Sequence, residues 1–273
     1  MGRKGKTACR ITGLCRATWT YKPQPKRDDT PLREAILRIA AKRRRFGQER
    51  IYIVLRREGW KDNMKRVRRI YKEEGLSLRL KRRRKLSAGV RVPMPAADRP
   101  NHTWSMDFVH DKLVSGRSLK CLTVVDEFTR ECLAVEVDTG LNGARVTRVL
   151  DQLIELRGKP EAVRCDNGPE FASNKTDAWA YAGGLRLQYI QPGRPTQNAF
   201  IESFNGRFRE ECLNENQFQT LIEAQVVIDA WRKDYNEERP HGSLRGLTPS
   251  EFAARHTTNE QAKIIPVPQL ETV

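Results

Sequence analysis

The chain has 273 residues and a formal net charge of +17, from 51 Lys and Arg against 34 Asp and Glu. The charge is unevenly placed, because residues 1–100 hold 31 basic and 9 acidic side chains, a net of +22, whereas residues 101–273 have a net of −5. No apolar run reaches the length of a signal peptide or a membrane span, and the six cysteines form no C-x-x-C pair, which disfavours membrane proteins, disulfide scaffolds and zinc ribbons. We therefore expect a cytoplasmic protein with free thiols, whose basic arm attracts a polyanion, most commonly nucleic acid.

The basic arm predicts a helical DNA-binding unit. Residues 1–30 form a basic segment without a clear pattern, and residues 31–76 contain three short helices, the last of which begins after Asp62 or Asn63. A cationic third helix behind a tight turn is typical of a helix-turn-helix that enters a DNA groove, with a small bundle carrying a solvated basic surface as the alternative. The side chains of this helix expected to contact DNA are Lys65, Arg66, Arg68, Arg69 and Lys72.

A basic linker is predicted at residues 77–100. Its run "LKRRRK" is expected to track DNA phosphates through Arg82, Arg83 and Arg84. The three prolines that follow favour an extended chain, which would join the helical unit to the rest of the protein.

From residue 101 the pattern changes to that of an α/β domain. Three segments, "TWSMDFVHDKL", "SLKCLTVVDEFT" and "ECLAVEVD", alternate or run apolar as strands do. They are followed by a helix, the short buried strand "AVRCD", a helix, a strand and a helix. The prediction is a mixed sheet flanked by helices over residues 101–215, a C-terminal helical extension of this core over 216–256 and a tail over 257–273.

Three acidic residues of this domain stand in unusual places. Asp107 lies in the middle of a strand, Asp166 ends a strand where open α/β sheets place ligand-binding residues, and Glu202 lies beside the apolar positions of a helix. Brought together they would repel one another unless a cation neutralised them, and two Mg²⁺ ions about 4 Å apart would also clamp the attacking and leaving oxygens of a phosphoryl transfer. Gly168 would let the backbone approach a metal or a phosphate closely.

The helix of Glu202, "NAFIESFNGRFREE", presents further polar side chains. Arg209 lies seven residues beyond Glu202, nearly two turns, so that both project from one side with Asn205 between them. Such a side could hold a metal and the DNA next to it, and on this helix alone a solvated polar face is the favoured interpretation. The apolar stripe of the helix is expected to be Phe200, Phe204 and Phe208.

Three other polar residues have simpler interpretations. Arg194 lies in a proline-glycine loop before this helix and is a further candidate for contact with DNA. Asp126, near a strand end, is expected to bond the turn that follows it, and His241 is expected to be a packed or capping histidine and no catalytic base.

Taken together, "WSMDFV", "RCDNGPEF" and "PTQNAFIESFNGRFREECLNE", with 35 residues between Asp166 and Glu202, resemble the DDE catalytic core of bacterial insertion-sequence transposases. The type is the IS-three-like family, whose catalytic domain is similar to retroviral integrase. The resemblance extends through "GLSLRLKRRRK" and "AWRKDYNEERPHGSLRGLTPSEF" and so covers residues from about 30 to 256. It implies an RNase H-like fold in which Asp107, Asp166 and Glu202 are catalytic and ligate two Mg²⁺ ions, for which Mn²⁺ substitutes, and in which Arg209 contacts DNA near the site.

The resemblance also implies an activity and partners. The activity is Mg²⁺-dependent cleavage at element ends and transfer of the 3′-hydroxyl into target DNA, and because two ends must meet we expect a homo-oligomer on DNA, associated with the nucleoid. No His/Cys zinc domain and no leucine heptad are present, so the chain is expected to be a second-reading-frame product that works with an upstream-frame protein carrying a helix-turn-helix and a leucine zipper. The alternatives are an RNase H-like nuclease that cuts without joining and a DNA-binding regulator without catalytic activity.

Overall fold

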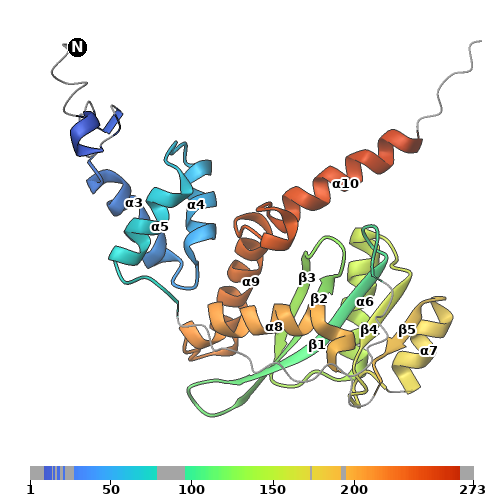
Figure 1. Cartoon of the computed structure of the whole chain (residues 1–273). Coiled ribbons are helices and arrows are strands. Elements are labelled where there is room, and N and C mark those ends of the chain that lie inside the picture. Colours follow the sequence, from blue (N-terminus) through green and yellow to red (C-terminus); the bar gives the residue numbers. More distant parts are fainter. Residues whose placement is uncertain are drawn as a thin grey trace, which may run out of the picture.

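The computed structural model describes residues 28–78, 96–172, 174–191 and 195–264, together with short pieces between residues 9 and 21. A twisted sheet with helices on both faces forms the larger part, and a group of three helices lies beside it (Figure 1). The predicted fold class, a mixed sheet flanked by helices and preceded by a small basic helical unit, is confirmed.

The three-helix unit consists of α3 (Thr30–Lys42), α4 (Gln48–Arg57) and α5 (Met64–Glu73). Each helix turns its apolar side inward, and the three sides share one core built from residues such as Ile36, Ile51 and Ile70, none of which is exposed. The third helix begins where the sequence predicted, because the Asn63 side chain accepts a hydrogen bond from the backbone N–H of Arg66 (2.9 Å).

The sheet has five strands in the order β3-β2-β1-β4-β5. Strands β1 (Thr103–Lys112), β2 (Ser118–Asp126) and β3 (Cys132–Asp138) form an antiparallel meander, and β4 (Ala162–Cys165) and β5 (Arg186–Tyr189) add to it in parallel. The first strand is therefore central, and it pairs with β2 on one side and with β4 on the other.

Helices cover both faces of the sheet and make two separate apolar cores. On one face α6 (Gly143–Arg157) and α7 (Asn174–Ala182) pack against Trp104, Met106 and their neighbours. The other face is covered by η1 (Pro195–Asn198), α8 (Ala199–Glu211), η2 (Leu213–Glu215) and α9 (Leu221–Glu237), with α8 lying across β1 and β2 (Figure 1).

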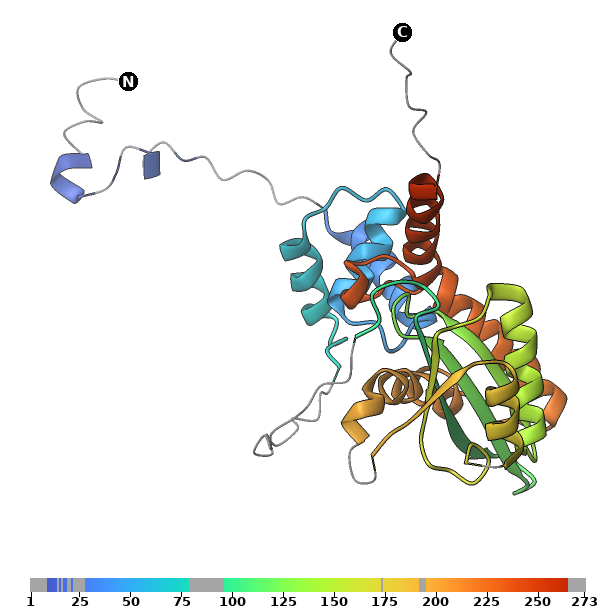
Figure 2. The ribbon, with the colours of Figure 1, turned by 90° about the vertical axis from the view of Figure 1, so that its right-hand side faces the viewer.

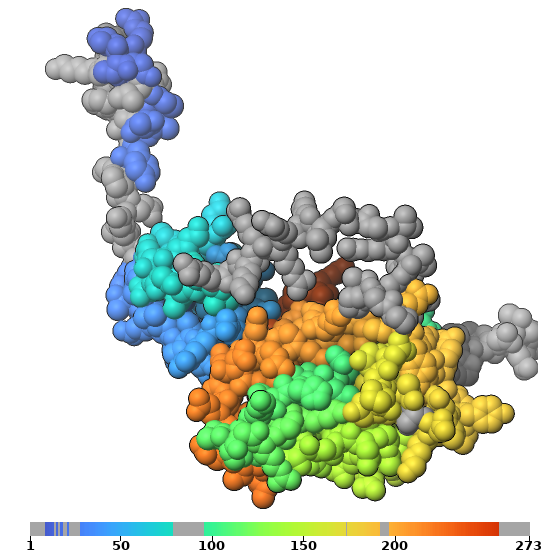
Figure 3. All heavy atoms as spheres, turned by 90° about the horizontal axis from the view of Figure 1, so that it is seen from below, coloured from blue at the N-terminus to red at the C-terminus, as the bar shows by residue number. Residues whose placement is uncertain are grey.

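After α9 the chain makes the short turn η3 (Gly242–Leu244) and ends in α10 (Pro249–Ile264). Figure 2 shows the three-helix unit beside this C-terminal part. Arg57 of α4 bonds both the carbonyl of Gly246 (3.2 Å) and the carboxylate of Glu251 (2.6 Å). In the space-filling view of Figure 3 the same unit adjoins the surface of α8 and η2.

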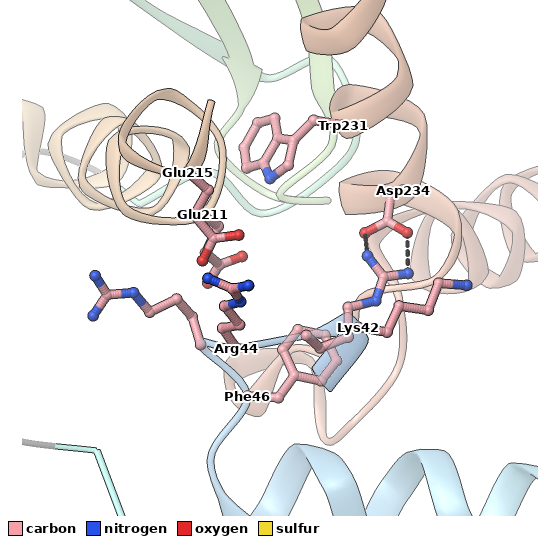
Figure 4. A pocket seen from close by; sticks show the side chains of 9 residues that line it. Lys42, Arg44, Phe46, Glu211, Glu215, Trp231 and Asp234 are labelled. Atoms are coloured by element: carbon pink, nitrogen blue, oxygen red, sulfur yellow. Dashed lines mark hydrogen bonds and ion pairs between the residues drawn. The ribbon is translucent and has the colours of Figure 1, made fainter. Parts of the chain in front are cut away.

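Ion pairs fasten the three-helix unit to the sheet domain around a small pocket (Figure 4). The guanidinium of Arg43 pairs with both carboxylate oxygens of Asp234 on α9. Phe46 from the helical unit and Trp231 from α9 line the same pocket. Because this ion pair joins residues 191 positions apart in the sequence, it helps to fix the position of the three-helix unit relative to the sheet domain.

Several predicted features lie outside the described residues. These are the phosphate-tracking Arg82, Arg83 and Arg84 of the linker and most of the tail over 257–273, and the same holds for Arg194. Over the part of the chain that the structure describes, no helix is long and apolar enough to cross a membrane.

Candidate active site

Asp107 and Asp166 come from neighbouring parallel strands. The register pairs Ser105 of β1 with Arg164 of β4, and two residues further along each chain lead to Asp107 and Asp166. Side chains two positions apart point to the same face of a sheet, and adjacent strands lie about 4.8 Å apart. The two carboxylates therefore leave the sheet on the face covered by α8.

The helix α8 places Glu202 on the same side of the sheet. Asn205, one turn after Glu202, donates its amide N–H to Asp107 Oδ2 (2.8 Å) and accepts a bond from Thr123 Oγ1 on β2 (2.9 Å). Residues three apart on a helix are neighbours on its surface, so this clamp turns the side of Glu202 toward Asp107. The Glu202 side chain itself is exposed, whereas Asp107 is half-buried.

The pKa of Asp107 is affected by both of the other carboxylates. Its pKa is raised to about 6, chiefly because burial disfavours the ionised form and further because Asp166 and Glu202 add negative charge. Hydrogen bonds from the Phe108 backbone and from Asn205 oppose this rise only partly. A cation at this point would relieve both the desolvation and the repulsion.

A glycine shapes the position of Asp166. The backbone N–H of Gly168 donates to Asp166 Oδ1 (2.9 Å), and a Cβ built on Gly168 would lie 2.9 Å from the same oxygen, closer than real Cβ atoms come. Any larger residue would push the carboxylate aside. Gly168 was expected to let the backbone approach a metal or a phosphate closely, and in the structure its backbone approaches the Asp166 carboxylate instead. The side chain of Asn167 donates to the carbonyl of Ile190 (2.9 Å).

The donor set fits a hard divalent cation, because Mg²⁺ prefers carboxylate oxygens and because the Gly168 cradle leaves Asp166 room to ligate. The carboxylates are not gathered into a finished site. Among the residues that the structure describes, no group of three His, Cys, Asp or Glu lies close enough together to hold a metal ion.

The residues expected to contact DNA fall into different settings. Arg209 is exposed, and its Nη2 donates to the carbonyl of His110 on β1 (2.8 Å). Asn205 uses both ends of its amide on Asp107 and Thr123, so that in this structure it orients a catalytic candidate and does not face outward. The remaining described candidates are Lys65, Arg66, Arg68, Arg69 and Lys72 on α5.

The cations of α5 are divided between internal and outward positions. Arg66 pairs with Asp29 and Asp62, and Arg69 pairs with Asp29 and Glu73. The side chains without an ion pair in the described ranges are Lys65, Arg68 and Lys72, all of them exposed. The sequence prediction treated all five alike, since it could not show that Asp29 lies beside this helix.

A buried charge network under α8 was missed by the sequence reasoning. Arg164 and Glu127 are 2% and 1% exposed, their side chains pair at 2.6 Å, and Ser105 also donates to Glu127. The network lies two residues below Asp107 and Asp166 on the same face of the sheet. A charged residue inside the apolar strand "AVRCD" was the signal that could have revealed it.

The apolar side of α8 differs from the expected stripe. Ile201, Phe204 and Phe208 are buried, whereas Phe200 is only half-buried and lies under the guanidinium of Arg130, 3.8 Å from its ring centroid. Both triplets have helical spacing, so sequence periodicity alone could not choose between them.

Asp126 and His241 have the expected structural roles. Asp126 accepts backbone bonds from Phe128 (2.8 Å) and Thr129 (2.9 Å) and closes the turn after β2. His241 is 4% exposed and meets the ring of Tyr235 edge-on. Burial and the nearby arginines lower its pKa to about 2, which leaves it neutral and unsuited to act as a base.

Comparison with known families finds matches along most of the chain. The integrase core domain family matches residues 97–195, a second family of the same description matches residues 183–249, and the HTH-like domain family matches residues 26–85. The first two span the sheet, α8 and α9, and the third spans the three-helix unit.

Individual relatives agree with these matches. An insertion element IS407 protein of 31.7 kDa from Burkholderia multivorans is 49% identical over 257 residues, which are 94% of this chain and 93% of the relative. The putative transposase InsK for insertion sequence element IS150 of Escherichia coli is 27% identical and covers 77% of this chain and 78% of its own. A chain of a simian T-cell lymphotropic virus intasome in complex with PP2A regulatory subunit B56 gamma superposes with a TM-score of 0.50 at 15% identity. The match covers 87% of this chain and 79% of the other, and it supports the fold alone.

Proposed function

The chain belongs to the integrase-core transposase family of bacterial insertion elements, whose members act in DNA transposition, and from that premise we propose that it cuts and joins DNA strands itself. Water attacks the phosphodiester at an element end, so that a P–O bond to water forms and the 3′-oxygen leaves as a hydroxyl. That hydroxyl then attacks a phosphodiester of the target DNA. A P–O bond forms between the element's 3′-oxygen and the target phosphorus, and the P–O bond to the target's own 3′-oxygen breaks, so that the upstream target segment leaves with a 3′-hydroxyl. Neither step needs a covalent bond to the protein.

Asp107, Asp166 and Glu202 are the proposed ligands of two Mg²⁺ ions, with Mn²⁺ as a substitute. When bound, the ions would supply positive charge to the reacting phosphate. The exposed position of Glu202 is consistent with a residue that moves inward when cation and DNA arrive. Other residues of the site hold two of these carboxylates in position.

Asn205 fixes the orientation of the Asp107 carboxylate, because its own amide is held by Thr123. Gly168 holds Asp166 through its backbone N–H and leaves space for it. Arg209, at the exposed end of α8, is proposed to bind a phosphate near the site, as are the outward cations of α5.

The observation that carries the proposal is geometric: Asp107 and Asp166 follow neighbouring strands on one face of the sheet, and Asn205 bonds the helix of Glu202 to Asp107, whose pKa is raised in this setting. Two carboxylates from other elements, Asp166 and Glu202, contribute to that rise, so three separately positioned acids act on one point of the sheet face. A purely structural set of acids would be expected to have basic partners. Asp107 instead has none within ion-pair distance among the described residues.

The test is joining of a labelled duplex, made from the element's own inverted repeat, to plasmid DNA in Mg²⁺. We expect wild type to form joined product and Glu202→Gln to form none. The matched control is Glu210→Gln, because Glu210 is an exposed acid of the same helix that contributes nothing to Asp107. Equal joining by Glu202→Gln would remove Glu202 from the site.

The same assay separates the other functions. Cutting without joining would identify a nuclease of this fold, and DNA binding with neither reaction would identify a regulator or a need for the upstream-frame protein. Adding that protein distinguishes the last two outcomes. Because two element ends must be brought together, we also propose that the active species is a homo-oligomer on DNA, which analytical ultracentrifugation of the DNA complex would measure.

A further inference from the structure

A second cavity, lined by apolar side chains and by two arginines, borders α8 on the side away from Glu202. At 100° per residue, Phe200, Ser203 and Arg207 lie on one flank of the buried stripe of this helix, and Glu202 and Asn205 lie on the other. The cavity has a volume of about 260 Å³. Its remaining walls come from the turn after β2, from α9 and from η3, including Arg130, Tyr235, His241 and Ser243.

Two arginines line this cavity without a carboxylate partner in the described part of the chain. Arg130 has a backbone φ of 65°, its guanidinium lies over the Phe200 ring, and its buried Nη1 has no hydrogen-bond partner there. Arg207 is bonded to the backbone carbonyl of Ser203 (3.2 Å), which neutralises no charge. Both side chains are thus positioned by neutral groups.

The surroundings of the cavity add further positive charge. Arg239, which is 1% exposed, and Arg50 both approach Glu211, the first at 2.7 Å and the second at 3.9 Å. One carboxylate therefore serves two buried or half-buried arginines. Arg130 and Arg207 have no carboxylate within ion-pair distance among the described residues, and Glu127 and Asp126 act on Arg130 only from further away. The pKa of Arg50 is lowered to about 10 by burial and by Arg239, and burial lowers the pKa of Arg130 even though Glu127 and Asp126 oppose that fall.

The wall of the cavity also contains a buried polar atom without a partner. His241 is 4% exposed and lines the cavity, and its Nε2 has no hydrogen-bond partner among the described residues. Unpartnered buried polar atoms are rare in native proteins, because leaving such an atom without a hydrogen bond is costly. The hydroxyls of Ser203 and Ser243, both exposed residues, lie at the same cavity and can donate to an anion.

We propose that this cavity binds a backbone phosphate of DNA that crosses the exposed side of α8, with Arg130 and Arg207 as the residues that hold it. The assignment rests on the proposed function for the presence of DNA, and on the surplus of guanidinium groups for the phosphate. Guanidinium pairs anions of this shape with several N–H groups at once, and the two flanks of one helix are close enough for a single DNA molecule to reach both. The cavity would position the strand whose neighbouring phosphate reacts beside Glu202.

The experiment measures DNA affinity and does not depend on catalysis. Fluorescence anisotropy with the labelled inverted-repeat duplex gives Kd at a series of salt concentrations in EDTA for the full chain. The variants are Arg130→Gln, Arg207→Gln, their combination and Ser243→Glu, and the matched control is Arg148→Gln. Arg148 is an exposed arginine of α6, on the opposite face of the sheet.

We expect the double variant to bind DNA about tenfold more weakly and to lower the slope of log K against log salt by about 0.9, the value expected when the protein neutralises one phosphate fewer. Ser243→Glu should act in the same direction, because it places a carboxylate at the mouth of the cavity without altering a buried residue. Arg148→Gln should leave the slope unchanged. Circular dichroism melts check that each variant is folded. If the double variant does not fold, the salt slope of Ser243→Glu tests the proposal in its place.

A methylphosphonate scan then locates the phosphate. Removing the charge at one position of one strand should weaken binding to wild type and leave binding to the double variant unaffected. If no position shows this coupling, or if the double variant and Ser243→Glu keep the wild-type slope while wild type joins strands normally, the cavity is not a DNA site and the proposed function stands. If the slopes change as expected but wild type forms no joined product, the cavity binds DNA and the proposed catalysis fails. Stabilisation by inorganic phosphate without a coupled position would mean a small-anion site and would also overturn the proposal.

Discussion

Two arginines of α5 and two arginines that line the cavity beside α8 differ in their partners. On α5, Arg66 and Arg69 are each held by two carboxylates. Beside α8, Arg130 and Arg207 have only an aromatic ring and a backbone carbonyl. Of these four arginines, the two in the more basic segment of the sequence are the better neutralised.

Local charge density in the sequence is thus a poor guide to where a polyanion binds. An arginine within an internal ion pair must lose that pair before it can bind a phosphate, so its gain is reduced. An arginine placed by neutral groups offers its full charge. The same reasoning applies with the sign reversed to Asp107, an acid whose nearest charged neighbours include Asp166 and Glu202. The proposed sites are therefore marked by charged side chains that lack an ion pair, and not by the segments with the most charged residues.

The largest expected effect comes from neutralising the unmatched acid. Asp107→Asn should lower the rate of strand cleavage by about 10⁴-fold or more, the scale seen when one member of a cooperating catalytic set is removed. Rates on a labelled duplex in Mg²⁺ measure this. Asp111→Asn, on the same strand, is the control and should remain active, and a similar loss there would show that the strand tolerates no amide.

Next in size is the matched buried pair below the site. Glu127→Gln leaves Arg164 charged and 2% exposed without its carboxylate, which should lower the free energy of unfolding by about 3–5 kcal/mol. Urea titration measures the change. Replacing both residues, as in Glu127→Leu with Arg164→Met, should recover much of the loss, and a double variant as unstable as the single one would contradict this account.

A smaller effect concerns the pH dependence of stability. The pKa of Asp107 in the folded protein is about 6, against 3.8 for the free group, so the folded state holds the proton more tightly than the unfolded state. Wild type should therefore lose stability as the pH rises through 6, by at most about 3 kcal/mol at 1.36 kcal/mol per unit. Asp107→Asn lacks this loss.

Melting curves of the two proteins in EDTA test that sign. Asp107→Asn should be the more stable protein at pH 8, and the difference should shrink below pH 4. Added Mg²⁺ should stabilise wild type more than the variant at pH 8. A difference that is constant over the whole pH range would show that Asp107 is not destabilised by its charge.

The smallest effects should separate the two kinds of cation on α5. Changing Lys65, Arg68 and Lys72 together to Gln should lower the salt slope of DNA binding by about 0.9 for each phosphate that these side chains neutralise, with little change in Tm. Arg66→Gln should instead lower the Tm, since Arg66 ties Asp29 and Asp62 to the helix, and should leave the slope almost unchanged. If Arg66→Gln alters the slope as strongly as the triple change, internal pairing does not decide which cations bind DNA.

Much of the fold could be predicted because it depends on short-range patterns. The three helices of the basic arm, the meander and the later strands each have their own apolar periodicity, and Asn63 and Gly158 mark ends that the structure has. Two members of the predicted stripe of α8, Phe204 and Phe208, are buried, and Ile201 takes the place predicted for Phe200. Two apolar triplets of helical spacing overlap there, and only packing against the sheet decides which one is buried.

The residues of the candidate site also differ in how well the local sequence predicts them. Asp107 and Asp166 stand out locally, since an acid in a strand and an acid before Asn-Gly are unusual at such positions. The partners of these acids come from elsewhere in the chain: Asn205 is 98 residues from Asp107, and Glu127 is 37 residues from Arg164. Such contacts have no signature in the neighbouring sequence.

The sequence by itself determined the fold class, the order of the elements and the positions of three acids with a family spacing, because periodicity, capping and motif spacing are properties of neighbouring residues. Only the tertiary structure decided which charges have partners. Asp29 neutralises α5 from 37 residues away, and Asp234 holds Arg43 across 191 residues, while no carboxylate in the described chain pairs with Arg130. Pairing depends on which side chains the folded chain brings within a few ångströms, and that distance exists only after the elements have packed.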